Sequence, residues 1–436
     1  MPALISYLLL FHLSVTIFGA IEIPGAYVSD GTFIGMTTKK VTSSSPMYAS
    51  PSGSGSTCSN NAPCTIETAF GKLKSGSVLY LKQGTYNLKN GLNIAASGTA
   101  SSYIVISSAP NEQATLTSSR TDSINLITVS GSYIIIENLI MTKVTAKNVK
   151  GIVFWGNGQN HVIIRNNKMT YLKTSITNSG SYGANGILLM GESTNTIKNV
   201  MIYNNQVRYC TLGYSEGISI AGNCENIYVI SNYVKDNTNI GIDFYGNAGY
   251  CSNPSLDQPR KSVAINNDIE RISSPNADCA GLYVDGGRDI YLSKNFIYSS
   301  QYGIEIGSEE RNDNYPVTNI IVQNNTLQDN TVCGLRIGGY DQVDTGYVKN
   351  SQIKYNEIKG SNYAIIISKA DNIKIEYNKF VGINTYFVNM EFTSTYTKNI
   401  AINYNKFNGS GRFKLYGGSS ISLNDFVKKY PSNTIN

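Results

Sequence analysis

The chain has 436 residues, of which 41% are hydrophobic and 15% are charged, with 35 Lys and Arg against 29 Asp and Glu. The hydrophobic content allows a large core and argues against intrinsic disorder, and the low charge argues against a coiled coil or a helical bundle. The net charge of +6 is compatible with an acidic partner, but the sequence has no basic run of the kind that binds nucleic acid. The 31 Tyr and 40 Gly favour strands and turns.

The N-terminus predicts export from the cell. Residues 1–20 hold an apolar stretch that ends in small residues, which is typical of a secretory signal peptide. The alternative, a membrane anchor, needs about 20 apolar residues, and this stretch is shorter. We therefore expect a secreted, extracellular monomer with no membrane segment after signal cleavage. Residues 21–46 are expected to be an N-terminal extension and residues 47–436 the folded domain.

Cysteine and histidine usage restricts the possible chemistry. In an oxidising compartment Cys58 and Cys64 could close a short loop, and Cys251 and Cys279 could pair if their loops approach each other. No cysteine spacing is C-x-x-C, which gives a zinc site little support. Once the signal peptide is removed, His161 is the only histidine, so a multi-histidine metal site is excluded. His161 opens an apolar strand pattern, which favours a structural role.

Two short sequence elements recur along the chain. The first is a β-branched run followed by Asn, and this Asn returns at positions 138, 167, 205, 232, 267, 295, 325, 356, 378 and 405. The second is a small residue followed by apolar-x-apolar, as in GILLMG (186–191), GISIAG (217–222) and AIIISK (364–369). Each repeat therefore contains at least two short strands of period two, joined by turns rich in Gly, Asn and Ser.

These repeats predict a solenoid of strands. No segment shows a convincing helical period, and strands this short form no stable hairpins alone. Stacked in parallel on the next repeat, they bury a continuous aliphatic core. The repeated Asn suits an inward turn position, where side-chain amides stack into a ladder. We predict an all-β fold, a right-handed parallel β-helix of about ten coils.

Residues 48–87 (YASPSGSGSTCSNNAPCTIETAFGKLKSGSVLYLKQGTYN) resemble the N-terminal segment of secreted pectate-lyase-like β-helix proteins. The resemblance implies a Ser/Gly-rich loop, a short capping helix at about Ile66–Leu73, and then a strand and a G-x-Y turn at Gly84 and Tyr86. It covers nearly all of the mature chain. It implies the architecture and leaves the reaction open, because this superfamily contains lyases, hydrolases, epimerases and non-enzymatic tailspikes.

The second element also predicts which side chains face outward. In G-I-x-I the aliphatic residues point into the core, so the residue between them points to solvent. Coil by coil, this gives an outward column of Leu188, Ser219, Asp243, Tyr283, Glu305, Arg336 and Ile366. Two residues further along lies a second column of Met190, Ala221, Tyr245, Asp285, Gly307, Gly338 and Ser368. Asp243, Asp285 and Glu305 are therefore expected to form one acidic cluster.

Long loops follow the same strands. Residues 246–262 supply Asp257, Arg260 and Lys261, residues 308–316 supply Glu309, and residues 340–346 supply Tyr340. Such loops on one side of a β-helix would enclose a groove. Three clustered carboxylates repel one another unless a metal, an Arg or a shared proton compensates. The alternative for each single residue is a solvated or ion-paired surface side chain.

A groove of this composition suits a linear polysaccharide, neutral or acidic. The resemblance to pectate lyases implies a first hypothesis, β-elimination assisted by Ca²⁺. The calcium ligands would be Asp243, Asp285, Glu305 and Asp257, and the base Lys261, Arg260 or Arg336. Tyr245, Tyr283, Tyr340 and Glu309 would contact the sugars. The family's signature motifs are missing, so the identity of the base stays open.

Two other functions remain possible at this point. A glycoside hydrolase would use two carboxylates, and Asp243 and Glu305, two coils apart, are roughly 9–10 Å apart at the backbone, near the range for inversion. A non-catalytic glycan-binding surface protein would have a dispersed or fully ion-paired acidic cluster. Chelation should abolish the activity of a calcium-dependent lyase and spare that of a hydrolase.

Overall fold

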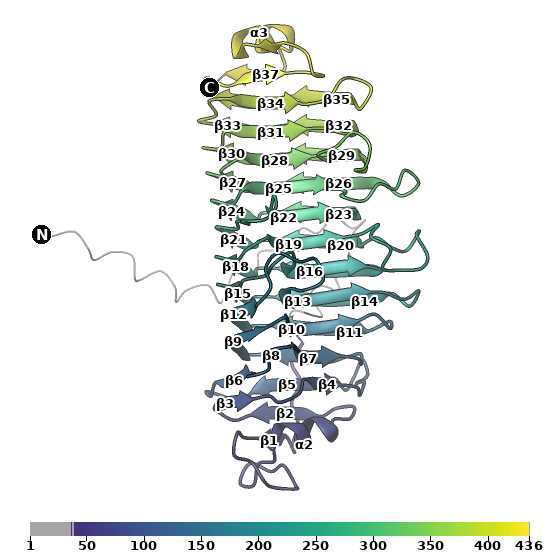
Figure 1. The fold of residues 1–436 in the computed structure, drawn as a ribbon, viewed down its shortest axis with the longest axis vertical. Helices are drawn as coiled ribbons and strands as arrows, with labels where there is room; N and C mark the ends of the chain where they lie inside the picture. The colour runs from purple at the N-terminus through teal and green to yellow at the C-terminus, as the bar shows by residue number, and fades with distance from the viewer. Residues whose placement is uncertain (1–35, 37–38, 436) are drawn as a thin grey trace, which may run out of the picture.

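The computed structural model describes Met36 and residues 39–435. The signal peptide predicted at residues 1–20 lies outside the described residues, as does most of the extension predicted at residues 21–46. From Met47 onward the chain forms three sheets of 13 strands each, wound as successive coils of one solenoid (Figure 1). The predicted parallel β-helix is confirmed. Each sheet has more strands than the about ten coils that the ten repeated Asn residues indicated, because the first coils lack that Asn.

Each coil contributes a strand to the first, second and third sheet in turn. The first sheet contains β1 (Met47–Ala49), β2 (Val78–Leu81), β5 (Ile104–Ser108), β8 (Ile134–Glu137), β11 (Asn160–Arg165), β14 (Ile197–Tyr203), β17 (Cys224–Ile230), β20 (Arg260–Ile265), β23 (Arg288–Ser293), β26 (Val317–Gln323), β29 (Val348–Lys354), β32 (Ala370–Glu376) and β35 (Thr397–Asn403). The second contains β3 (Gly84–Asn87), β6 (Ala114–Thr117), β9 (Ile140–Ala146), β12 (Lys168–Thr174), β15 (Gln206–Arg208), β18 (Tyr233–Lys235), β21 (Asp268–Glu270), β24 (Phe296–Tyr298), β27 (Thr326–Gln328), β30 (Glu357–Lys359), β33 (Lys379–Val381), β36 (Lys406–Asn408) and β39 (Thr434–Ile435). The third contains β4 (Leu92–Ile94), β7 (Ser123–Val129), β10 (Asn148–Trp155), β13 (Ala184–Gly191), β16 (Glu216–Gly222), β19 (Ile240–Tyr245), β22 (Ala280–Asp285), β25 (Tyr302–Gly307), β28 (Cys333–Ile337), β31 (Tyr363–Ile367), β34 (Tyr386–Met390), β37 (Arg412–Lys414) and β38 (Ser420–Ile421).

The two ends of the solenoid are covered by short helices. Helix α2 (Ile66–Gly71) begins at Thr65, whose hydroxyl accepts the Thr68 N–H at 3.1 Å, and it buries Ile66 and Phe70. It lies where the capping helix was expected. Helix α3 (Leu423–Lys429) covers the other end, where the ring of Phe426 stacks on that of Phe413. These caps keep water from the open ends of the aliphatic core.

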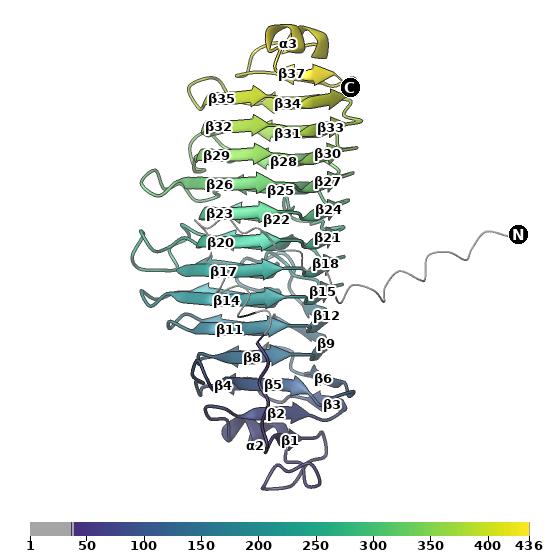
Figure 2. The same cartoon turned by 180° about the vertical axis from the view of Figure 1, so that it is seen from behind.

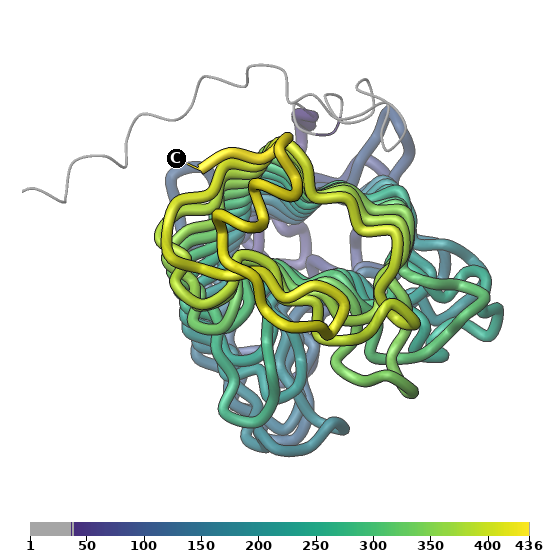
Figure 3. The backbone as a smooth tube through the Cα atoms, turned by 90° about the horizontal axis from the view of Figure 1, so that it is seen from above, coloured from purple at the N-terminus to yellow at the C-terminus, as the bar shows by residue number. Residues whose placement is uncertain are grey.

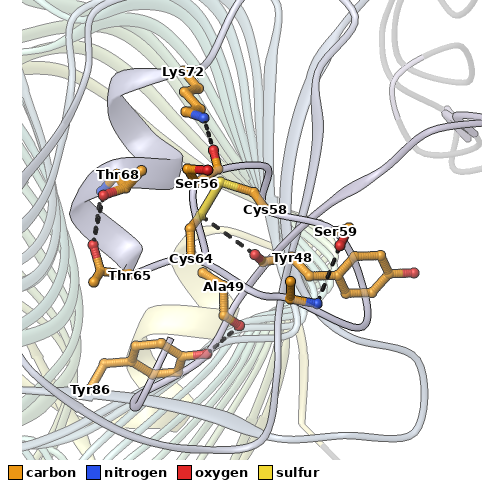
Figure 4. The surroundings of a disulfide bond; sticks show 11 residues. Tyr48, Ala49, Ser56, Cys58, Ser59, Cys64, Thr65, Thr68, Lys72 and Tyr86 are labelled. Carbon is orange, nitrogen blue, oxygen red and sulfur yellow. Dashed lines mark hydrogen bonds between the residues drawn. A yellow bond between two sulfur atoms is a disulfide. The ribbon is translucent and has the colours of Figure 1, made fainter. Parts of the chain in front are cut away.

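The loop before α2 is closed by a disulfide between Cys58 and Cys64, as predicted (Figure 4). Close by, the Tyr86 hydroxyl donates to the Ala49 carbonyl at 2.9 Å and fixes the G-x-Y turn against β1. The pairing of Cys251 with Cys279, which the sequence left open, is not formed, and both thiols are free and buried. Cys251 lies in the loop after β19 and Cys279 in the loop before β22, so the two thiols belong to loops at opposite ends of these strands.

The Asn ladder is confirmed at the corner between the first and second sheets. The Asn167 side-chain amide donates to the Asn205 side-chain oxygen at 3.1 Å, and this bond is repeated from coil to coil as far as Asn433. Asn138 is an exception. It is exposed and has φ of 59°, while Leu139 takes the ladder position and donates its N–H to Asn167.

The third sheet has the predicted register. Leu188, Ser219, Asp243, Tyr283, Glu305, Arg336 and Ile366 pair in succession across β13 to β31. Their neighbours Ile218, Ile242, Leu282 and Ile304 point into the aliphatic core. The outward polar side chains are nevertheless buried, with Asp243 only 2% exposed and Glu305 and Arg336 each 8% exposed. Loops from both edges of the sheet therefore cover this face.

The first sheet also carries an apolar cluster on its outer face. Met36, Tyr103, Ile163, Met201 and Tyr228 are among its buried members. Figure 2 shows residues 39–46, which lead into β1, running along this sheet. Among the described residues, no helix is long and apolar enough to cross a membrane.

Candidate functional site

The outer face of the third sheet forms the floor of a cavity of about 690 Å³. Its lining residues come from β10 at one end to β28 at the other, six strand spacings or about 29 Å along the axis. Loops at residues 175–183 and 271–279 border one side, and loops at 246–259, 308–316 and 338–347 border the other. Figure 3 shows such loops projecting from two sides of the solenoid. The result is an elongated groove, which suits a chain-like ligand.

Acidic side chains outnumber basic ones in the lining. Six carboxyl groups, those of Glu216, Asp243, Asp278, Asp285, Glu305 and Glu309, face the cavity together with the basic groups of Lys150 and Arg336. Ionised carboxyl groups at this density repel one another, and burial adds a desolvation cost. Several of these groups therefore hold their protons more tightly than in water.

Asp243 and Asp285 lie at the centre of the groove on the adjacent strands β19 and β22. Burial raises the pKa of Asp243 well above its ordinary value, and the negative charge of Asp285 raises it further. Burial also raises the pKa of Asp285 well above its ordinary value, and the charge of Glu309 raises it further, whereas the Glu309 N–H, which Asp285 Oδ1 accepts at 2.8 Å, acts in the opposite direction. Asp243 Oδ1 is buried and has no hydrogen-bond partner. The two carboxyl groups thus differ in hydrogen bonding at Oδ1, and both have raised pKa values.

Glu305 and Arg336 form the C-terminal part of the floor. Burial raises the pKa of Glu305 to about 8, while Arg336 acts in the opposite direction. The Arg336 guanidinium lies 3.6 Å from Glu305 and 3.6 Å from Glu391, and its Nη1 lies 3.5 Å from the Tyr302 hydroxyl. Burial alone would lower the pKa of Arg336, but the negative charges of Glu305 and Glu391 outweigh it, so the pKa of Arg336 is raised and this residue is a poor base.

Lys150, Asn185 and Glu216 form a second polar group at the β10 end. The Lys150 ammonium donates to the Asn185 side-chain oxygen, and the Asn185 amide donates to the Glu216 carbonyl at 2.8 Å. Burial lowers the pKa of Lys150 to about 8, although the charge of Glu216 opposes this shift. A lysine of this kind is partly neutral near physiological pH and can act as a base.

Most of the predicted site residues do meet in this groove. Its lining includes Asp243, Asp285, Glu305, Arg336, Glu309, Tyr245, Tyr283 and Tyr340. The tyrosines differ in what they expose: Tyr283 is buried in the floor at 4% exposure, whereas Tyr340 is 62% exposed at the rim. Tyr245 packs edge-on against Tyr250 from the 246–259 loop. Tyr340 is therefore the best placed of the three to contact a sugar ring.

Three predicted residues lie outside the groove, and their proposed roles are corrected here. Arg260 and Lys261 begin β20 of the first sheet, where both pair with Glu225, at 2.9 Å and 3.0 Å. The chain has already turned the corner from the third sheet before residue 260. Asp257 accepts the N–H groups of Gly249 and Cys251, so its carboxylate holds the loop together. None of the three lines the cavity.

The sequence analysis missed Lys150 and Glu216. Each comes directly before the glycine of the second repeated element, in K-G-I (150–152) and E-G-I (216–218). Strict alternation from the buried Ile152 and Ile218 would turn this preceding position inward. The strand pairing skips the glycine, and this irregularity leaves Lys150 and Glu216 facing the cavity. The register of Lys150 with Asn185 confirms that the position forms a further column.

The predicted calcium site receives mixed support. Carboxylate oxygens are suitable calcium ligands, and the unpartnered Oδ1 of Asp243 is an acceptor that a cation would satisfy. However, within Met36 and residues 39–435 no three His, Cys, Asp or Glu side chains converge closely enough to hold a metal ion. The residues as arranged do not form a calcium cage. Calcium binding stays a prediction.

Comparison with protein families identifies the architecture. The family model described as a Pel9A-like, right-handed β-helix region matches residues 47–332. The chain belongs to this family. The match confirms the right-handed coil and the relation to pectate-lyase-like proteins that the N-terminal segment implied.

Individual relatives extend this likeness without assigning an activity. The uncharacterized protein YwoF of Bacillus subtilis (strain 168) is 28% identical over 330 residues, which cover 71% of this chain and 67% of YwoF. A mannuronic-acid-specific polysaccharide family 6 lyase from human gut microbiota has a TM-score of 0.52 and 14% identity, covering 90% of this chain and 91% of the lyase. The GH136 lacto-N-biosidase from Eubacterium ramulus has a TM-score of 0.59 and 13% identity, covering 84% and 67%. At these identities the two solved structures show the fold alone, a β-helix shared by lyases and glycoside hydrolases.

Proposed function

We propose that this protein is a carbohydrate-active enzyme that hydrolyses a glycosidic bond of a polysaccharide, with Asp243 as general acid and Asp285 as general base. The proposal rests on one observation: the two buried carboxyl groups lie on adjacent strands in an elongated groove, and Oδ1 of Asp285 accepts the Glu309 N–H while Oδ1 of Asp243 has no hydrogen-bond partner. Environments that separate two carboxyl groups in this way assign the acid and the base.

The proposed reaction needs only these two side chains and a water molecule. Asp243 donates its proton to the glycosidic oxygen as the bond from that oxygen to the anomeric carbon breaks. Asp285 takes a proton from the attacking water, whose oxygen forms the new bond to the anomeric carbon. Both groups are restored by returning one proton to Asp243 and releasing one from Asp285.

The backbone positions of the two residues are compatible with inversion at the anomeric carbon. Asp243 pairs in register with Tyr283, and Asp285 lies two residues further along β22. One strand spacing across and two residues along give a backbone separation of about 8 Å. Inverting glycosidases hold their carboxyl groups about 6.5–9.5 Å apart, whereas retaining enzymes need about 5–5.5 Å.

We further propose that the protein acts outside the cell as a monomer after removal of residues 1–20. The Cys58–Cys64 disulfide supports an oxidising compartment. An elongated groove with an exposed Tyr340 at its rim supports a polymeric substrate, neutral or acidic.

Incubation with a panel of neutral and acidic polysaccharides, with and without Ca²⁺, tests the proposal. We expect new reducing ends from at least one polysaccharide, and loss of at least 100-fold in rate for Asp285→Asn. Asp268→Asn is the matched control, because burial also raises the pKa of Asp268, to about 6, but this residue lies on the second sheet. Cleavage that survives Asp285→Asn would overturn the assignment, and binding without cleavage would indicate a glycan-binding protein.

A second candidate, β-elimination, is favoured by one specific observation. Lys150 has a pKa lowered to about 8 and lines the same groove, so it could remove a proton from a uronic acid. It lies on β10, three strand spacings or about 14 Å from β19, so it cannot act on the same bond as Asp243. Elimination would give an unsaturated product that absorbs ultraviolet light, with loss of activity in Lys150→Met and after chelation of Ca²⁺.

A further inference from the structure

Trp155 is the only tryptophan of the chain, and it is 40% exposed. It ends β10, which also supplies Lys150 and Asn148 to the groove, but Trp155 itself lies just beyond the lining of the cavity. Large aromatic side chains bury much surface when they find a partner, and an indole left this open is free to contact a ligand. The position of Trp155 beside the groove therefore calls for an explanation.

The register places the indole in line with the groove floor. Trp155 pairs with Met190, which pairs with Ala221 and then with Tyr245, and the last three residues line the cavity. Trp155 therefore continues an outward column of the floor by one strand toward the N-terminal end. It lies three strand spacings, about 14 Å, from the strand that carries Asp243.

The backbone around Trp155 is held firmly. The Gln159 side-chain amide donates to the Trp155 carbonyl at 3.0 Å, and the Gly156 N–H donates to the Met190 carbonyl at 2.7 Å. A β-carbon at Gly156 would lie 2.6 Å from the Glu192 nitrogen, so only glycine fits this turn. A rigid backbone presents the indole at a defined position, which lowers the entropy cost of binding.

The surroundings of the indole favour a sugar over a protein partner. Protein interfaces bury contiguous apolar patches, but the residues that follow and flank Trp155, such as Asn157 and Glu192, are polar. Among the described residues, no aromatic ring stacks on the indole. One exposed ring with polar neighbours suits a sugar, which offers an apolar C–H face and a rim of hydroxyl groups.

We propose that Trp155 is a sugar-binding platform that extends the groove along β10, past the residues that line the cavity, and makes the protein bind long glycan chains better than short ones. This inference rests on the proposed function for the identity of the ligand as a polysaccharide. It adds a distal subsite, far from the reacting bond, and predicts attack within long chains.

Fluorescence provides a direct test, because Trp155 is the only tryptophan and reports on its own surroundings. The full mature chain carrying Asp285→Asn is titrated with polygalacturonate, alginate and a soluble β-glucan, and binding is followed in parallel by calorimetry. We expect at least one polysaccharide to change the Trp155 emission in step with binding, and its short oligosaccharides to bind without that change.

Variants complete the test. Trp155→Ala should weaken binding of the long chain about three- to tenfold and leave short oligosaccharides unaffected, while Trp155→Phe should retain most of the affinity. Tyr171→Ala is the matched control, because Tyr171 is 43% exposed but lies on β12 of the second sheet.

The outcomes separate the two proposals. Binding that depends on Trp155 without any cleavage by the wild-type chain would refute the hydrolase and keep the platform. Cleavage with no emission change and with unaltered affinity in Trp155→Ala would overturn the platform. Failure of all three polysaccharides to bind would also count against it.

Discussion

Asp243→Asn is the substitution that probes the proposed chemistry most selectively. The amide has nearly the same shape as the carboxyl group but cannot donate a proton to the glycosidic oxygen. General acid catalysis typically contributes 10²–10⁴-fold, or about 3–5 kcal/mol of transition-state stabilisation. We expect kcat on a polysaccharide to fall by that factor.

The loss should depend on the leaving group. An aryl glycoside with an acidic phenol needs little help from a proton donor, so Asp243→Asn should hydrolyse it nearly as fast as the wild-type protein does. Asp285→Asn should lose activity on both substrates, because activation of water is needed in either case. Equal losses on both substrates in Asp243→Asn would refute its role as the acid.

Stability and pH dependence provide the controls for this variant. Because burial and Asp285 raise the pKa of Asp243, the folded state prefers the neutral form. Asparagine is always neutral, so Asp243→Asn should unfold at the same or a higher temperature at neutral pH. The wild-type rate should fall as pH rises through the raised pKa of Asp243, and this alkaline limb should disappear in the variant. A destabilised variant would contradict the assumption that Asp243 is protonated.

Three further outcomes are expected. The pKa of Glu305 is about 8 in the folded state, above its value in the unfolded chain. The stability that its protonated form contributes is therefore complete below about pH 4 and is lost as pH rises through 8. Glu305→Gln should flatten this decline in the unfolding free energy, measured by urea unfolding across that pH range. Chelation should leave the rate of a hydrolase unchanged, and loss of activity restored by Ca²⁺ would instead favour elimination. Asn267→Leu removes the hydrogen bonds from the Asn267 side-chain amide to Val229 and Asn295 and leaves the Asn232 N–H unpaired. This variant should lose about 2–5 kcal/mol of unfolding free energy. A loss below about 1 kcal/mol would contradict the stabilising role of the ladder.

The architecture could be predicted from the sequence because the solenoid repeats a local rule. Each coil must bury its alternate aliphatic residues, so G-I-x-I fixes which side chain faces outward. That rule alone aligned Asp243, Tyr283, Glu305 and Arg336 from the sequence, and the strand pairing has the same alignment. Register is strongly specified here, because a slip of one residue would turn the apolar set toward solvent.

The predictions that were wrong concern residues in or next to loops, whose sequences have no such periodicity. The sequence places Arg260 and Lys261 soon after β19, but where the chain turns onto the first sheet depends on loop packing, and both side chains end beside Glu225. Burial of the outward column was also not predictable, because how the loops fold over the sheet depends on contacts between loops of different coils, such as the bond from the Asn247 amide to the Tyr315 carbonyl. The loops lower the exposure of Asp243 to 2% and so create its raised pKa.

Trp155 shows that a readable signal can still be missed. The segment GIVFWG (151–156) is the same repeated element one coil earlier than the first one used to align the columns. Extending the alignment by that coil would have placed Trp155 next to Met190, where the structure has it.

The configuration of the first-formed product is the measurement that addresses the central claim most directly. NMR spectra recorded in the first minutes of digestion should show a new reducing end with the anomeric configuration opposite to that of the cleaved bond, and its rate of formation should depend on both Asp243 and Asp285. A product that retains the configuration, or one that carries a carbon–carbon double bond, would contradict the proposed roles of these two carboxyl groups.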